Sequence, residues 1–143
     1  MIKKRREISS FVILLFMMGC NNIGQEFIDI TYVNNTDKKI FVMDQWQAVT
    51  DTSLWETPWF EGIDEKRYCV INSYSSRVSR YIKKHIQTMI DDKGAYRFII
   101  YDVDTLKNVP WERIEKEYKI VKRVDIYSLD DLQKNNYLIT INP

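Results

Sequence analysis

A short apolar run just before a cysteine constrains this chain more than any other feature. Residues 11–18 (FVILLFMM) are wholly apolar, a cluster of four cations precedes them at residues 3–6, and Gly19 and Cys20 follow. As a helix these eight residues extend about 12 Å, whereas the bilayer core needs about 20 residues. The run therefore makes a poor permanent membrane span. Cations, an apolar stretch and a small residue before the cut are typical of a secretory signal.

Cysteine at the cut site adds a specific chemistry. The thiol of Cys20 can carry a diacylglycerol, and the amine freed by cleavage can take a third acyl chain. Two or three chains anchor a protein stably, because each buried CH₂ contributes about 0.8 kcal/mol. Met17 and Met18 stand where Leu and a small residue are usual, so the motif is relaxed. We predict a lipoprotein signal peptide over residues 1–19, lipidation at Cys20 and a lipidated tether over residues 20–26. The alternatives are an uncleaved signal anchor or a plain secretory signal.

The predicted mature chain has the size of one domain and is nearly neutral. Without the first 19 of 143 residues, 124 remain, enough to bury one hydrophobic core. The signal carries four of the 21 cations and one of the 20 acids, so the remainder has 17 cations and 19 acids, a formal −2. This balance gives no reason to expect nucleic acid as a partner. Cys69, the second cysteine, has no disulfide partner if Cys20 is acylated, and we expect a buried, inert thiol.

The spacing of apolar residues over 27–143 predicts a single α+β domain. We expect about six strands in an antiparallel or mixed, sandwich-like sheet, with two or three short helices. The strands are expected at residues 27–33, 39–43, 68–71, 95–101, 120–127 and 137–141. Helical spacing covers 78–90, with Gly94 as the helix exit, a second helix opens at Pro110, and a short helical turn opens at Ser128. The turn-forming residues 34–38 are expected to join the first two strands as a hairpin.

The long loop expected at residues 44–66 is the first place to look for a binding surface. It carries three tryptophans, Trp46, Trp55 and Trp59, and long structured loops are often functional. These rings would stack on a glycan or insert into a protein partner, where aromatic residues dominate binding. The alternative is that they cover the core as a satellite cluster. A basic helix side, predicted from Arg77, Arg80, Lys83 and Lys84, would either lie against anionic headgroups or be solvated.

Catalytic chemistry finds little support in the sequence. Asp102 and Asp104 follow an apolar strand, but Thr105 stands one residue too early for the Asp-x-Asp-x-Thr motif of haloacid-dehalogenase phosphatases. Two carboxylates can hold a divalent cation, yet no third ligand is evident, and the simpler interpretation is that they cap a turn. His85, the only histidine, is expected to be a solvated helix residue. We therefore predict no catalytic residue, no metal and no cofactor.

Several segments resemble a known group of proteins. They are residues 30–43 (ITYVNNTDKKIFVM), 48–54 (AVTDTSL), 98–106 (FIIYDVDTL) and 110–143 (PWERIEKEYKIVKRVDIYSLDDLQKNNYLITINP). Together they resemble a family of small uncharacterised lipoproteins of Bacteroides and related Bacteroidetes. The resemblance implies a location in the cell envelope, and it implies neither an activity nor catalytic residues. In that group Asp104-Thr105-Leu106 would match the tripeptide at which exported proteins are glycosylated, which predicts O-glycosylation at Thr105.

These observations together favour a membrane-anchored binding or interaction domain that is not an enzyme. The partner would be an envelope protein or a glycan. A structural accessory without a ligand is the alternative, and a small metal-assisted hydrolase using Asp102 and Asp104 is a third hypothesis. Asn21, rather than Asp, follows Cys20, and no acidic run comes after it. We therefore expect the outer membrane, with the domain facing the periplasm.

Overall fold

The structure, a computed structural model, describes residues 24–54 and 69–143. Over these ranges the chain forms seven strands in two sheets and four short helices, so the α+β prediction is confirmed. The elements in order are β1 (Phe27–Asn34), β2 (Ile40–Gln45), β3 (Cys69–Ile71), β4 (Ser75–Ile82), α2 (Lys83–Lys93), β5 (Tyr96–Asp102), α3 (Val103–Asn108), α4 (Trp111–Glu117), β6 (Lys122–Ile126), α5 (Leu129–Lys134) and β7 (Leu138–Ile141). Among the described residues, no helix has both the length and the apolar character that crossing a membrane requires.

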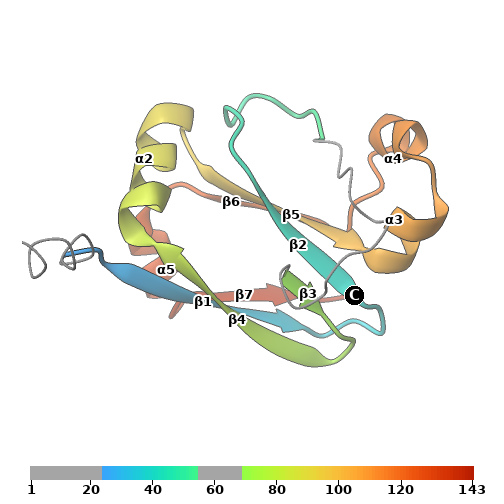
Figure 1. The fold of residues 1–143 in the computed structure, drawn as a ribbon, viewed down its shortest axis with the longest axis horizontal. Coiled ribbons are helices and arrows are strands. Elements are labelled where there is room, and N and C mark those ends of the chain that lie inside the picture. Colours follow the sequence, from blue (N-terminus) through green and yellow to red (C-terminus); the bar gives the residue numbers. More distant parts are fainter. Residues whose placement is uncertain (1–23, 55–68) are drawn as a thin grey trace, which may run out of the picture.

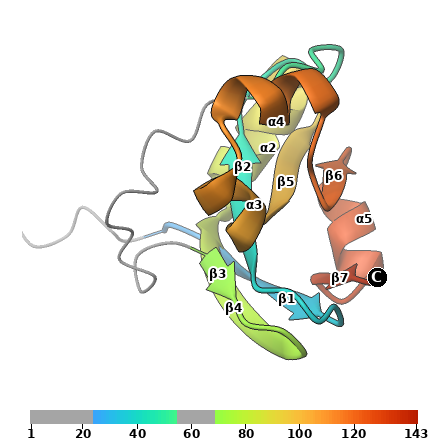
Figure 2. The same cartoon turned by 90° about the vertical axis from the view of Figure 1, so that its right-hand side faces the viewer.

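The two sheets lie face to face, and the helices sit at the ends and on one outer side. The smaller sheet has the order β4-β1-β7, with β1 antiparallel to β4 and parallel to β7. The larger sheet has the order β3-β2-β5-β6 and is antiparallel throughout. Figure 1 places α2 at one end of the molecule and α3 and α4 at the opposite end. In Figures 1 and 2 no helix of the described residues covers the outer side of the smaller sheet.

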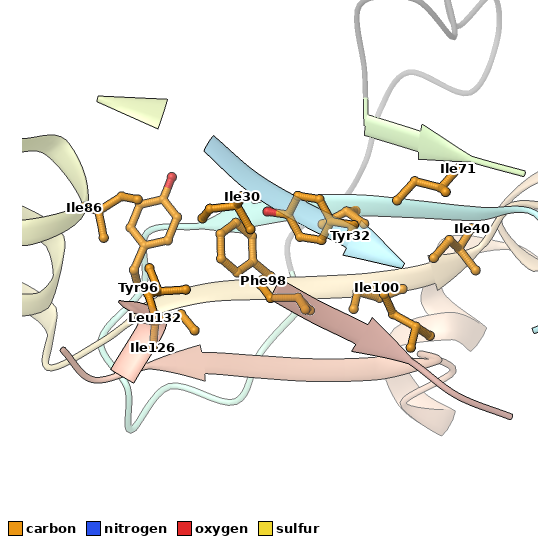
Figure 3. Packing of buried hydrophobic residues seen from close by; sticks show 13 residues of the cluster. Ile30, Tyr32, Ile40, Ile71, Ile86, Tyr96, Phe98, Ile100, Ile126 and Leu132 are labelled. Atoms are coloured by element: carbon orange, nitrogen blue, oxygen red, sulfur yellow. The ribbon is translucent and has the colours of Figure 1, made fainter. Parts of the chain in front are cut away.

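The main core fills the space between the sheets (Figure 3). Strand β1 contributes Ile30 and Tyr32, and the larger sheet contributes Phe98 and Ile100 from β5. The Phe98 ring stands edge-on to Tyr32, with ring centroids 5.6 Å apart, a geometry that adds to simple area burial. Ile139 and Ile141 close the core from β7, as the alternation at the end of the chain predicted.

A second apolar cluster lies on the other side of the larger sheet. Phe41 and Tyr101 from β2 and β5 pack there beneath the short helices. Ile114 of α4 and Leu106 of α3 cover them, and Leu54 closes the cluster from the chain that follows β2. Both faces of β5 are therefore buried, which explains its nearly continuous apolar sequence.

The predicted hairpin between the first two strands is wrong. Strand β1 pairs with β4 and β7, while β2 pairs with β3 and β5, so the two strands belong to different sheets. Residues Ile30 and Ile40 face the same core from opposite sheets. Packing their apolar faces against each other removes more surface from water than edge-to-edge pairing would, which favours the crossover.

The predicted helix over residues 78–90 is wrong in its first half. Residues 75–82 form strand β4, which pairs with all eight residues of β1, from Phe27 with Ile82 to Asn34 with Ser75. Helix α2 begins only at Lys83 and ends as predicted at Gly94, whose φ of 87° is left-handed. Pairing with β1 outweighs the local helical spacing, because it satisfies the backbone of eight residues at once.

Candidate functional site

Trp46 is the one predicted binding tryptophan that lies in the described part of the chain. It directly follows the end of β2, and 49% of its surface is exposed. Its indole Nε1 donates a hydrogen bond to Oδ2 of Asp44, 3.1 Å away. Trp55 and Trp59 lie outside the described residues, as does Cys20.

Three neighbours hold the indole of Trp46 in place. The hydroxyl of Tyr96 donates to the same Oδ2 of Asp44 at 2.8 Å. The His85 ring of α2 stands edge-on to Trp46, with centroids 5.2 Å apart, and edge-on to Tyr96 at 5.9 Å. Burial, followed by the charge of Asp44, raises the pKa of Tyr96 well above its usual range, so this hydroxyl stays a donor. We call Asp44, Trp46, His85 and Tyr96 the tryptophan cluster.

The tryptophan cluster combines an open aromatic surface with hydrogen-bonding atoms beside it. Both hydrogen bonds to the Asp44 carboxylate end on its Oδ2. Among the described residues no group donates a hydrogen bond to the other oxygen, Oδ1. The half-buried His85 likewise makes ring contacts but no hydrogen bond within those residues. A small ligand that stacks on the indole would find a carboxylate acceptor and an imidazole beside it, the mixture of apolar and polar groups that binding sites use.

The loop that follows Trp46 is held in place by a buried ion pair. Arg97 of β5 is 2% exposed, and its Nε donates to Asp125 of β6 at 2.8 Å. The two remaining guanidinium nitrogens donate to the backbone carbonyls of Val49 and Asp51. Arg123 donates to Asp125 as well, at 2.6 Å. Trp46 therefore stands between strand β2 and a loop whose carbonyls accept hydrogen bonds from Arg97. Because the chain on both sides is already ordered, ligand binding costs less conformational entropy.

The charges of this network explain the acidity of Asp125. Burial alone would raise the pKa of its carboxyl, but hydrogen bonds from Arg123 and Arg97 outweigh burial and hold the pKa below its usual value. The carboxylate thus favours the folded state above its ordinary pKa, and this contribution is lost as the pH falls through the depressed folded value. The network is a structural support in which the pair of Arg97 and Asp125 is largely buried.

Of the predicted pair of capping aspartates, Asp102 has a capping role, although it caps a helix rather than a turn. Asp102 is the N-cap of α3, and its side chain accepts a hydrogen bond from the backbone of Asp104 at 2.9 Å. It also pairs with Lys38 at 3.1 Å. Burial raises the pKa of the Asp102 carboxyl, but Lys38 and the backbone N–H groups of Asp104 and Thr105 together outweigh burial and hold the pKa below its usual value. Thr105 lies half-buried within α3, where a strand end and turn were expected. Within residues 24–54 and 69–143, no three His, Cys, Asp or Glu side chains group as metal ligands.

Cys69 is a free thiol at the start of β3 and is partly buried. The hydroxyl of Ser79 donates to its sulfur at 3.4 Å. Burial raises the pKa of the thiol, so less of the reactive thiolate exists at neutral pH. This environment agrees with the inert thiol that the sequence predicted.

The sequence predicted Trp46 as a candidate binding residue and did not predict its surroundings. His85 was expected to be a solvated helix residue; it lies on α2 as expected but is half-buried, because its ring packs against two aromatic rings. Only the spacing of Asp44 and Trp46, two residues apart, was a local signal. Nothing local indicates that α2 and β5 bring His85 and Tyr96 to the same place.

The fold and the tryptophan cluster define a small two-sheet α+β domain with an exposed aromatic surface. A scan against protein-family models found no match, and neither the search of curated proteins nor that of solved structures found a similar protein.

Proposed function

We propose that this protein is a lipid-anchored lipoprotein of the outer membrane, facing the periplasm, whose domain binds a glycan without catalysing a reaction. The anchor would be the acylated Cys20, and the glycan would bind at the tryptophan cluster. The proposal rests on the signal at the start of the chain and on the geometry around Trp46.

The observation that carries the binding proposal is the half-exposed indole of Trp46, held by Asp44 and His85. A free-standing surface tryptophan would gain burial by turning inward. This indole is instead fixed with a large part of its surface in water, beside an open carboxylate oxygen. Sugar rings present C–H groups to an aromatic face, whose quadrupole is negative, and hydroxyl donors around their rim. A glycan therefore fits both components of the site better than a purely apolar protein segment does.

Truncation of Trp46 tests glycan binding. We expect Trp46→Ala to weaken binding of the preferred oligosaccharide about tenfold or more, since losing an aromatic anchor costs at least ~1–2 kcal/mol. Quenching of tryptophan fluorescence identifies the ligand in a panel of oligosaccharides, and calorimetry measures the dissociation constant. Tyr127→Ala is the matched control, because Tyr127 is also exposed but lies outside the tryptophan cluster. A panel without any response, or equal affinity of Trp46→Ala and wild type, contradicts a glycan ligand and favours a protein partner or a structural accessory.

Replacement of Cys20 tests the anchor. In cells fed an alkyne-tagged palmitate, wild-type protein should become labelled and partition into the detergent phase, while Cys20→Ser should do neither, because it lacks the acceptor thiol. Cys69→Ser is the control and should be labelled like wild type, since it leaves the signal intact. Labelling that persists in Cys20→Ser would show that another residue is acylated and would refute this anchor.

A further inference from the structure

The outer face of the β4-β1-β7 sheet carries a group of exposed large hydrophobic side chains. Alternation places Ile30 and Tyr32 of β1 in the core, so their neighbours point outward. Eight large hydrophobic side chains are exposed in the described part of the chain, and four of them lie on this one face. They are Phe27 at 53%, Ile82 at 36%, Val78 at 59% and Leu138 at 43%.

Strand register gathers these four side chains into two groups. Phe27 and Ile82 are direct partners on β1 and β4. Val78 and Leu138 both stand beside Thr31, one on each side of β1. Between the groups Arg80 binds Asp29 through two hydrogen bonds of 2.8 and 3.0 Å, so the only charges facing out from the middle of this sheet form a neutral pair. We call this surface the outer sheet face.

The outer sheet face begins where the chain arrives from the proposed lipid. Phe27 follows Glu26, which is tied to α2 by a backbone hydrogen bond from Lys83 and by a 2.6 Å ion pair with the same lysine. From Cys20 to Glu26 the chain advances six residues, which reach about 20 Å even when fully extended. A lipid on Cys20 would therefore keep this end of the sheet within about 20 Å of the bilayer.

A second copy of the chain fits this face less well than a bilayer does. Three strands of up to eight residues cover roughly 400 Å² at about 4.8 Å between strands and 3.3 Å per residue. Stable protein interfaces need about 800 Å² from each partner. Contact with a bilayer does not need that area, because the anchor already confines the domain next to the membrane and raises the effective concentration.

We infer that the outer sheet face rests on the bilayer surface, with Phe27, Val78 and Leu138 in the interfacial layer. This inference rests on the proposed lipidation of Cys20. In Figures 1 and 2 residues 46–54, which follow β2, lie on the opposite side of the molecule from this face. Docking in this orientation turns the loop after Trp46 away from the membrane, toward the space where soluble glycans and envelope polymers are found.

Depth-dependent quenching on the full lipidated protein tests the inference. One variant carries a fluorophore at Val78→Cys on the outer sheet face, and the matched control carries it at Glu115→Cys on α4, which is exposed on the other side of the molecule. Both are made in a Cys69→Ser background and reconstituted into phosphatidylcholine vesicles that contain a lipid with a nitroxide on its acyl chain. We expect the label at position 78 to be quenched severalfold more than the label at position 115, with a blue-shifted emission.

The outcomes separate failure of the docking from failure of the anchor. If the protein enters the detergent phase but the two labels are quenched equally, docking is refuted and the anchor stands. If the label at position 78 is shielded from aqueous iodide only at high protein density and is not quenched by the lipid nitroxide, a second copy covers the face and docking is refuted. A protein that never partitions into detergent refutes the anchor, and the docking falls with it. Because Asp29 and Arg80 neutralise each other, the expected quenching persists at high salt.

Discussion

Arg97→Ala is expected to lower the free energy of unfolding by about 3–5 kcal/mol. The guanidinium is 2% exposed and is the shared partner of Asp125 and of the carbonyls of Val49 and Asp51. Alanine would leave a largely buried carboxylate and two backbone acceptors without that donor, and these losses are the costly part. Urea denaturation followed by circular dichroism measures the change.

Two further variants show whether the loss comes from this network. Arg113→Ala removes an exposed arginine that pairs with Glu117 across one helical turn, and it should leave the unfolding midpoint almost unchanged. The double variant Arg97→Met with Asp125→Leu removes both charges of the buried pair, and it should be less destabilised than Arg97→Ala because only the partly exposed Arg123 then loses an ion pair. A double variant as unstable as the single one would show that packing, rather than the carboxylate that has lost its buried partner, dominates the loss.

Asn34→Ala is expected to cost about 3 kcal/mol, since several buried groups lose their partners at roughly 1–3 kcal/mol each. Asn34 is fully buried at the point where the chain leaves the smaller sheet. Its Nδ2 donates to the carbonyls of Lys38 at 2.7 Å and Asn72 at 2.9 Å, and its Oδ1 accepts from the backbone of Thr36 at 3.0 Å. These bonds join the crossover after β1 to the turn between β3 and β4.

The adjacent asparagine is the matched control for this position. Asn35 has an exposed side-chain hydrogen bond to Asn142, so Asn35→Ala should change the thermal midpoint far less than Asn34→Ala does. Calorimetry of both variants gives the comparison. Equal stability of the two would mean that the crossover does not depend on the Asn34 amide, and would leave apolar packing alone to hold the two sheets together.

The alternation of apolar and polar residues predicts well those strands that have one buried and one exposed face. The alternation of Ile28, Ile30 and Tyr32 predicted which side of β1 is buried, and Ile139 and Ile141 did the same for β7. Side chains in a strand point to opposite faces in turn, so burial of one face is visible in the sequence itself. Gly94 was identified as a helix exit for a comparable reason, because its left-handed φ is cheap only for glycine.

Prediction from the sequence pattern fails where a helix and a strand would both fit the same spacing of apolar residues. Val78, Tyr81 and Ile82 fit a helical stripe, yet they lie on β4, where Tyr81 turns toward the core and Val78 toward solvent. Helix α3 was missed because its N-cap Asp102 looks like any turn-forming aspartate, whereas α5, which also has six residues, was predicted from its start at Ser128. Short elements hold too few residues for either period to stand out.

The candidate site also has one part that the sequence indicated and another that it did not. The exposed Trp46 belongs to a stretch whose composition already indicated a binding surface. His85 and Tyr96 come from α2 and β5, roughly 40 to 50 residues further along the chain, and no spacing rule connects them to Trp46. Contacts of this separation depend on how the sheets and α2 pack together.

By itself the sequence determined the α+β class, the buried faces of β1 and β7, the exit of α2 and the presence of an apolar run before Cys20. Each of these features depends on residues that are close in sequence, because side-chain direction and backbone preference repeat over a few positions. Only the tertiary structure decided that β1 and β2 belong to different sheets, that residues 75–82 are a strand, and that His85 stands against Trp46. Those outcomes depend on burial summed over partners distant in sequence, where packing of whole faces outweighs local preference.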